Sequence, residues 1–276
     1  MTRRWLAVLA LLATATAWGT SFPLVKNVVV RISPEAFIFT RFTLAGLVLV
    51  FVARRSLSRA LLAPGVLLGM LTFTGYWMQT TGLLTISASR SAFLTGLYVV
   101  LVPFFQWRTT GRPKLNVWIA SVLAVVGTTV LIGGGFAARP TFGDLLTIAC
   151  AVAFAWHVVL SSRYSTHETS TALAAVQVLV VGLAAAPLTL FTRASAWDAT
   201  VVTVILFTAI VTTALAFAAL MWGQAHVTAT EAAVILSFEP VAAAIPAIAF
   251  EGEPFTLPFA IGAAFILAAM LLSQMR

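Results

Sequence analysis

The segment Thr228–Glu253 reads TATEAAVILSFEPVAAAIPAIAFEGE and carries the signals of a membrane-spanning helix. It contains a run of about twenty mostly apolar residues, which is long enough to cross the hydrocarbon core of a bilayer. Thr228 and Glu231 form a Thr-x-x-Glu capping box, which predicts that a helix begins there. Glu239 stands near the middle of the segment. We therefore expect a spanning helix with an acidic residue at mid-depth.

A similar pattern occurs 141 positions earlier in the chain. Ser87–Leu94 reads SASRSAFL, and Thr228–Ile235 reads TATEAAVI. An apolar helix that recurs at half the chain length indicates two copies of one unit, although chance similarity between alanine-rich segments is the alternative. Further matches in the same order favour duplication. They pair Ala17-Trp18 with Ala155-Trp156, Gly46 with Gly182, Ser121 with Gly262, and Gly127 with Ala268.

The composition of the chain excludes a soluble domain. It is 61% hydrophobic and only 9% charged over 276 residues, with a mean hydropathy of +1.04, whereas soluble domains carry about 25% charged residues. Backbone groups in lipid must be paired within the protein, so the choice lies between a helix bundle and a closed barrel. The apolar runs are about twice as long as the roughly ten-residue alternating segments of a barrel. The prediction is an all-α integral membrane protein.

Ten transmembrane helices fit the pattern, five in each half. Because five is an odd number, the second half must enter the membrane from the opposite side, so the halves are inverted repeats, predicted at 1–134 and 143–276. The N-terminal apolar run resembles a secretory signal, but it continues to about Val30 and is interpreted as the first span. The predicted spans are 5–26, 34–53, 61–84, 88–107, 115–134, 143–163, 170–191, 199–222, 229–249 and 256–274.

The basic residues predict an orientation rather than a nucleic-acid partner. The net charge is +8, but the sixteen Lys and Arg residues are scattered between apolar runs, which is typical of the positive-inside bias. With the N-terminus in the cytoplasm, ten lie inside and five outside, so both termini are expected there, in a cell inner membrane. The inside set is Arg3, Arg4, Arg54, Arg55, Arg59, Arg108, Arg112, Lys114, Arg163 and Arg276, and the outside set is Lys26, Arg31, Arg90, Arg139 and Arg193.

Short motifs in a fixed order carry a resemblance to a known family. They are Trp18–Pro23 (WGTSFP), Pro34 with Arg41, Phe238–Pro240 (FEP) and Gly252–Glu253. In these residues the chain resembles the EamA-type transporters of the drug/metabolite transporter superfamily over essentially its whole length. Within that family it is most similar to bacterial inner-membrane amino-acid exporters, especially those for aromatic amino acids. The resemblance implies a transporter built from two tandem five-helix repeats. Gln177 departs from the repeat, because it falls about where the first half has Arg41.

Glu239 and Tyr98 are the leading candidates for a substrate site. Inverted-repeat transporters bind substrate near the bilayer midplane, between the repeats. At about 1.5 Å per residue, Glu239 lies roughly 16 Å from the start of its helix, and Tyr98 is its counterpart 141 positions earlier. A carboxylate at that depth usually marks a substrate or ion pathway. The alternative is a local role, in which the acid bonds backbone freed by Pro240.

Other polar and aromatic residues are also expected deep in the membrane. Aromatic rings there suit an apolar or aromatic substrate, and amides suit its polar end. Glu239 and His157 are candidates for coupling transport to protons, although a lone membrane histidine is more often a packing residue. Arg41 either snorkels toward the surface or meets a substrate carboxylate. The predicted cavity residues are Trp18, Tyr76, Gln79, Tyr98, Trp156, His157, Trp222 and Glu239.

These features favour a secondary transporter that moves amino acids or similar small metabolites, outward, by alternating access. A channel and an intramembrane enzyme that transfers lipid or prenyl groups are the alternatives. The sequence has no clustered acids for a metal, no paired histidines on one helix face and no nucleotide-binding loop. We therefore expect no enzyme activity, no metal and no cofactor. The expected partners are a small-molecule substrate and the lipid bilayer, and a monomer is one arrangement left open.

Overall fold

The computed structural model describes residues 3–109, 111–131, 141–192, 196–243 and 256–275, in which every regular element is helical. The first half contains α1 (Arg3–Val29), α2 (Pro34–Ala53), a 3-10 turn (Arg59–Leu61), α3 (Leu62–Gly82), α4 (Ala88–Gly96), α5 (Tyr98–Thr109) and α6 (Leu115–Leu131). The second half contains α7 (Phe142–Tyr164), α8 (Ser170–Thr189), α9 (Ala199–Ala209), a π-helical segment (Ile210–Leu215), α10 (Ala216–Gln224), α11 (Ala229–Leu236) and α13 (Leu257–Gln274).

These helices agree with the predicted all-α membrane fold. In the described residues, six helical stretches are long and apolar enough to cross a membrane, and two shorter apolar helices correspond to the predicted fifth and tenth spans. The fourth and ninth spans are broken helices, α4 with α5 and α11 with the helical residues 239–243. The rest of the ninth span, including Glu251 and Glu253, lies outside the described residues.

Side-chain caps explain where several helices begin. The predicted capping box is confirmed, because Thr228 accepts from the Glu231 amide and Glu231 in turn accepts from the Thr228 amide. Ser87 caps α4 in the same way by accepting from the amide of Arg90. Ser33 caps α2. The matching segments at Ser87 and Thr228 therefore start equivalent helices.

The fourth span differs from the continuous helix expected over 88–107. It is interrupted at Leu97, whose amide bonds to the carbonyls of Leu94 and Thr95 and so tightens the last turn of α4. Gly96, a poor helix former, immediately precedes the break, whereas α5 runs through Pro103 without interruption. The ninth span breaks in the equivalent place, at the turn of residues 237–238. Both breaks lie near the middle of their spans.

Equivalent helices of the two halves cross at glycines. A Cβ on Gly46 of α2 would lie 2.8 Å from Cα of Leu179 in α8, and one on Gly182 of α8 would lie 2.5 Å from Oγ1 of Thr43 in α2. The contact is reciprocal, as expected for a pair related by a two-fold axis. Gly127 of α6 likewise approaches the backbone of α13. Because glycine has no side chain, these positions let the two halves approach closely along their interface.

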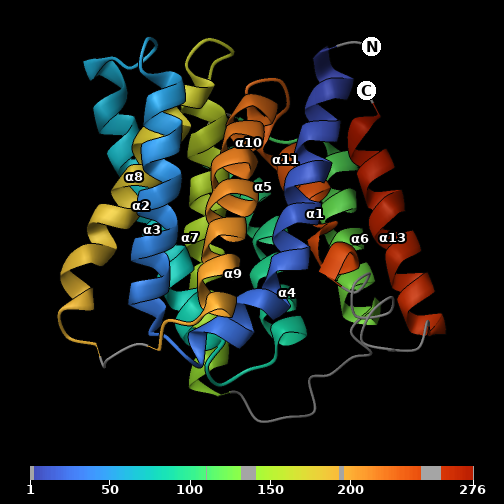
Figure 1. Cartoon of the computed structure of the whole chain (residues 1–276). Helices are drawn as coiled ribbons and strands as arrows, with labels where there is room; N and C mark the ends of the chain where they lie inside the picture. Colours follow the sequence, from blue (N-terminus) through green and yellow to red (C-terminus); the bar gives the residue numbers. More distant parts are fainter. Residues whose placement is uncertain (1–2, 110, 132–140, 193–195, 244–255, 276) are drawn as a thin grey trace.

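The helices form one upright bundle in which the two halves run in opposite senses (Figure 1). The N- and C-termini lie at the same end of the bundle. Helix α11 begins at this end, whereas its counterpart α4 begins at the opposite end. This arrangement is the inverted repeat inferred from the sequence. It brings the broken helices α4–α5 and α11 into the interior, between the halves.

Candidate functional site

A cavity lies inside the bundle between the two halves of the chain. About 50 Å³ of it is open to the centre of a water molecule. Helices α1, α2, α3, α5, α7 and α10 contribute to its wall, together with the segments on either side of the two breaks. Nine of the nineteen described lining residues are apolar, and the other ten carry polar or ionisable groups. Apolar walls with convergent polar groups are typical of a small-molecule site. The polar and ionisable lining residues are Ser21, Arg41, Thr72, Tyr76, Gln79, Thr80, Thr95, Tyr98, His157 and Glu239.

Glu239 lies at the wall of this cavity, directly after the break in the ninth span. Its side chain is 8% exposed, and it makes no hydrogen bond or ion pair within the described part of the chain. It is also the first residue of the helical segment after the break at residues 237–238, where the helix dipole stabilises negative charge. A buried carboxylate without a partner is costly in an apolar interior. The arrangement suits a cationic or hydrogen-donating ligand.

Arg41 contributes a buried positive charge to the same cavity. Its Nε donates to Oγ1 of Thr213 over 2.6 Å, and its Nη2 donates to Oγ1 of Thr212 over 2.9 Å. The side chain is therefore held inside the bundle and does not snorkel toward the surface. In the described residues no carboxylate is paired with it. Because an arginine remains charged, an anionic group on a ligand would find its counterion here.

The π-helical segment Ile210–Leu215 positions Arg41. In a π-turn the regular i to i−4 hydrogen bonding is interrupted, which frees backbone groups, and such turns are frequent at functional sites. Here the carbonyl of Thr212 accepts from Nε1 of Trp18 over 2.8 Å and from Nη2 of Arg41 over 3.3 Å. The predicted eighth span, 199–222, is therefore one membrane helix with a local irregularity at the cavity.

Aromatic rings surround the guanidinium. Cζ of Arg41 lies 5.2 Å from the ring centroid of Phe42 and 5.3 Å from that of Tyr76, within cation–π range. Tyr76 also packs edge-on against Phe154 of α7. Trp18 contacts Phe217 of α10 at 5.7 Å between centroids. Rings from both halves thus enclose the charged centre and exclude water from it.

Several polar atoms around the cavity lack partners. Oη of Tyr98 and Oγ1 of Thr72 are buried and make no hydrogen bond within the described residues. In contrast, Nε2 of Gln79 donates to Oγ1 of Thr95 over 2.9 Å. Buried polar groups are normally satisfied, so the unpaired hydroxyls mark places where a ligand or water would bond.

His157 lines the cavity but is bonded on its far side. Its Nε2 lies 2.7 Å from Oε1 of Gln177 in α8, and Ser161 is also within reach at 3.3 Å. Gln177, the residue that replaces an arginine in the second half, is thus the partner of this histidine. The geometry favours the packing interpretation of His157 and leaves its other ring nitrogen available.

Six of the eight predicted cavity residues line the cavity. The other two, Trp156 and Trp222, are absent from its described lining. Trp156 stacks on Phe105 with 4.5 Å between ring centroids, and Trp222 packs against His226. Arg41 was predicted only as an ambiguous deep residue, and Thr72, Thr95 and Phe217 were not predicted. The six are Trp18, Tyr76, Gln79, Tyr98, His157 and Glu239.

The described residues contain no group of three or more His, Cys, Asp and Glu residues that could hold a metal ion. The single cysteine, Cys150, is buried in α7. The described lining offers one carboxylate, one guanidinium, one imidazole, hydroxyl and amide groups, and aromatic rings. These groups can bind and orient a small molecule with both apolar and charged parts.

Comparison with known proteins identifies relatives over the whole chain. A family model described as the EamA-like transporter family matches residues 5–133 and again residues 141–275. An uncharacterized transporter of Archaeoglobus fulgidus is 33% identical over 278 residues, covering 99% of this chain and 87% of that protein. The uncharacterized transporter YvbV of Bacillus subtilis is 25% identical over 268 residues, covering 92% of this chain and 87% of that protein.

A solved crystal structure, whose own description names no function, supports the fold. It is 19% identical to this chain, with a TM-score of 0.84 and coverage of 98% of both chains. At that identity the similarity concerns the architecture alone. The same helical arrangement therefore exists in a protein of very different sequence.

Proposed function

Because the chain belongs to the EamA-like transporter family and is a multi-pass membrane transporter, we propose that it is a secondary carrier for amino acids or similar small zwitterions. Export across a cell inner membrane is the direction we assign. Aromatic or other apolar amino acids are the preferred substrates. The two repeats, assigned to 1–134 and 143–276, rock against each other so that the cavity faces one side of the membrane at a time.

The observation that carries this proposal is the presence of two opposite buried charges in one cavity. Glu239 is suited to a substrate ammonium, and Arg41 is suited to a carboxylate. Neither is paired with an opposite charge among the described residues. A zwitterion would neutralise both at once, which removes the cost of burying each charge alone.

The aromatic wall supports the preference for apolar substrates. Tyr76 and Phe42 lie beside Arg41, and Tyr98 lines the same cavity from the broken helix α4–α5. A side chain of a substrate bound by its polar ends would contact these rings. Aromatic rings prefer apolar and aromatic partners, so small polar side chains should bind less well.

The experiment that tests this function is transport into proteoliposomes. Purified protein should carry labelled phenylalanine, tryptophan and leucine with saturable kinetics, and each unlabelled amino acid should compete with the others. Analogues that lack either the ammonium or the carboxylate should compete poorly. The solute recovered should be chemically unchanged.

Other outcomes would point to other classes of protein. Equal flux of unrelated polar solutes without saturation would indicate a channel, and covalent conversion of the solute would indicate an enzyme. Saturable transport of a simple cation or anion, with no competition from amino acids, would support the carrier function. It would contradict the assignment of a zwitterionic substrate.

A further inference from the structure

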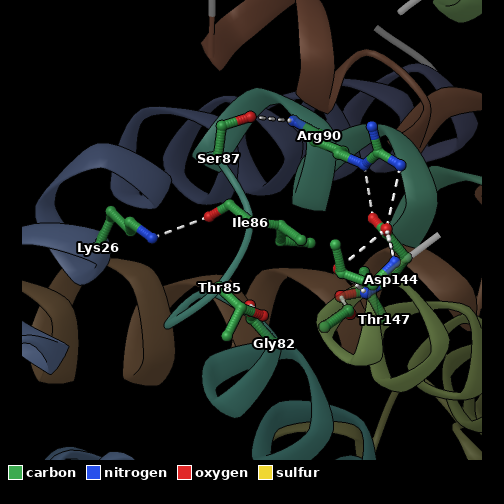
Figure 2. Close-up of polar contacts among 10 residues, drawn as sticks. Lys26, Gly82, Thr85, Ile86, Ser87, Arg90, Asp144 and Thr147 are labelled. Atoms are coloured by element: carbon green, nitrogen blue, oxygen red, sulfur yellow. Dashed lines mark hydrogen bonds and ion pairs between the residues drawn. The ribbon is translucent and has the colours of Figure 1, made fainter. Parts of the chain in front are cut away.

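Among the described residues, three ion pairs join the two halves of the chain. One of them, Arg31–Asp198, is about half exposed, and the other two lie at opposite ends of the bundle. Nη2 of Arg4 in α1 lies 2.7 Å from Oε1 of Glu231 in α11, at the end that bears the termini. Nε of Arg90 in α4 lies 2.5 Å from Oδ1 of Asp144 in α7, and its Nη2 lies 3.0 Å from Oδ2 (Figure 2). Each pair therefore connects a helix of the first half to a helix of the second.

The two pairs are equivalent by the repeat but have inverted charges. Arg90 and Glu231 are 141 positions apart, and each is the third residue after its N-cap. Their partners, Asp144 and Arg4, stand in the first turns of α7 and α1, the first helices of the two halves. The same contact thus occurs once at each end of the repeat structure, and the acidic and basic residues exchange places between the two copies.

Both pairs lie the same distance outside the central cavity. Along α11, Leu236 is the first residue of the cavity wall, five positions after Glu231. Along α4 it is Thr95, five positions after Arg90. At 1.5 Å per residue this is about 7.5 Å in each case. The ion pairs therefore lie between the cavity and the two ends of the bundle.

A second hollow lies at the end of the bundle that bears the termini. Arg4 and Glu231 line it, together with Arg112 and Lys114. Oε1 of Gln106 in α5, which lines the same hollow, accepts from the amide and the hydroxyl of Thr230. The Arg4–Glu231 pair therefore forms part of the wall of this hollow.

Hydrogen bonds within a single half of the chain are found at the same two ends of the bundle. The ammonium of Lys26, near the end of α1, donates to the carbonyl of Leu83 in the first half. It also donates to the carbonyl of Ile86, as Figure 2 shows. Ser165, directly after α7, donates to the carbonyl of Met221 in the second half over 2.6 Å. A rigid movement of one half against the other would preserve these contacts and break an ion pair.

We propose that the two ion pairs are the alternating gates of the carrier. Arg4–Glu231 closes the cavity toward the end that bears the termini, and Arg90–Asp144 closes it toward the opposite end. One pair separates while the other holds, as the halves rock. The proposal rests on the carrier function proposed above, and it assigns gating to four residues outside the cavity.

The partial exposure of the pairs suits such a role. The side chains of Arg4 and Glu231 are 29% and 14% exposed, and those of Arg90 and Asp144 are 26% and 4% exposed. Charges that separate at the ends of the bundle can be rehydrated, whereas charges separated in its centre could not. Each gate can therefore favour the state in which its own end of the cavity is closed and can still separate when the halves move.

The test measures access to the cavity from each side. Ser21, a cavity residue on α1, is replaced by cysteine in a Cys150→Ser background, and a small charged methanethiosulfonate is added to one side of sealed vesicles. Arg4→Gln should raise the labelling rate from the side of the termini at least about threefold and lower it from the other side. Arg90→Gln should do the opposite. The double variant should return toward the parent rates, because the two biases cancel.

Matched variants separate gating from general loss of stability. Glu231→Gln and Asp144→Asn remove the charge but retain an oxygen that can cap the helix, and they should shift labelling as their arginine partners do. Lys26→Gln removes a cation at one end whose hydrogen bonds stay within one half. Arg163→Gln removes a cation in the last turn of α7 that makes no ion pair within the described residues. Helix α7 begins at the opposite end from α1. Neither control should change the sidedness of labelling.

The outcomes test the gates separately from the assignment of the substrate. Opposite shifts that cancel in the double variant support the gates even if no amino acid is transported. Lower abundance in all four gate variants, without a change in the side from which Ser21→Cys is labelled, would overturn the gates. The pairs would then only stabilise the folded protein. Equal labelling from both sides in the parent and every variant would overturn the carrier and the gates together.

Discussion

Tyr98 and Glu239 occupy equivalent positions in the two halves, and both side chains line the same cavity. Each begins a helical segment directly after the break in its span. The repeat has therefore placed a hydroxyl-bearing ring and a carboxylate at one structural position. A binding site for an asymmetric molecule needs such a difference, because two identical positions would not distinguish the ends of the substrate.

Replacing Glu239 with glutamine should abolish most transport. The amide retains the volume but cannot neutralise a substrate ammonium, so we expect at least a tenfold loss of kcat/KM, about 1.4 kcal/mol of transition-state stabilisation. Transport in proteoliposomes measures the change, and the amount of protein in the membrane should be unaltered.

The pH dependence of this variant separates two roles of Glu239. If the carboxylate also carries a coupling proton, transport by the glutamine variant should lose its dependence on pH. If it only binds substrate, the pH profile should keep its shape at a lower rate. Glu168→Gln, which changes an exposed acid between α7 and α8, is the control. Parent-like flux in the Glu239 variant would assign this residue to the local backbone role instead.

Tyr98 should act through both its ring and its hydroxyl. Tyr98→Ala removes the platform for a substrate side chain, and we expect at least about a tenfold loss of transport. Tyr98→Phe removes only an oxygen that has no hydrogen-bond partner among the described residues, so the melting temperature should stay the same. A raised KM for tyrosine or tryptophan in the phenylalanine variant would place the hydroxyl in contact with substrate. Unchanged transport in both variants would contradict the assigned site.

The sequence was sufficient to predict the inverted repeat because its signals are local. The capping box at Thr228 and the runs of apolar residues depend on neighbours within a few positions, and both were found where they were expected. The break at Leu97 was not predicted, because it follows a glycine, Gly96, whereas the proline of the same span, Pro103, lies six residues further on. In the folded chain Gly96 ends the first half-helix and the proline is accommodated within the second.

The candidate site was harder to predict because depth along a helix does not specify direction around it. Trp156 and His157 are neighbours at one depth, but only the histidine faces the cavity. In helices that are apolar on every side, periodicity does not separate the lipid face from the interior. The bond between Arg41 and the π-helical Thr213 joins residues 172 positions apart, and no pattern in either segment signals it.

The glycine crossing between α2 and α8 should not accept a side chain. A Cβ on Gly46 would lie 2.8 Å from the backbone of Leu179, so Gly46→Ala should force the helices apart and lower stability by about 1–3 kcal/mol. Thermal unfolding in detergent measures this. Gly96→Ala is the control, because a Cβ there would meet nothing within 4 Å. Equal melting temperatures for both variants would show that the crossing is not tightly packed.

The orientation of the protein can be tested at two exposed positions. Ser58 lies between α2 and α3, and Thr200 lies in the first turn of α9 at the opposite end of the bundle. In a Cys150→Ser background, Thr200→Cys should react with an impermeant maleimide in intact cells. Ser58→Cys should react only after permeabilisation, because the positive-inside bias places it in the cytoplasm. The reverse labelling would invert the assigned orientation, and labelling of both from outside would contradict the inverted repeat.

His157 should prove to be a structural residue with a secondary effect on transport. His157→Ala would leave the side chain of Gln177 buried without its partner at Oε1, which typically costs about 1–3 kcal/mol. We therefore expect a lower melting temperature, with KM changed less than in the Glu239 variant. His157→Ala combined with Gln177→Leu removes both polar groups and should recover much of the lost stability, since an apolar pair needs no hydrogen bond. If the double variant regains stability but transports without any dependence on pH, the coupling role belongs to His157 rather than to Glu239.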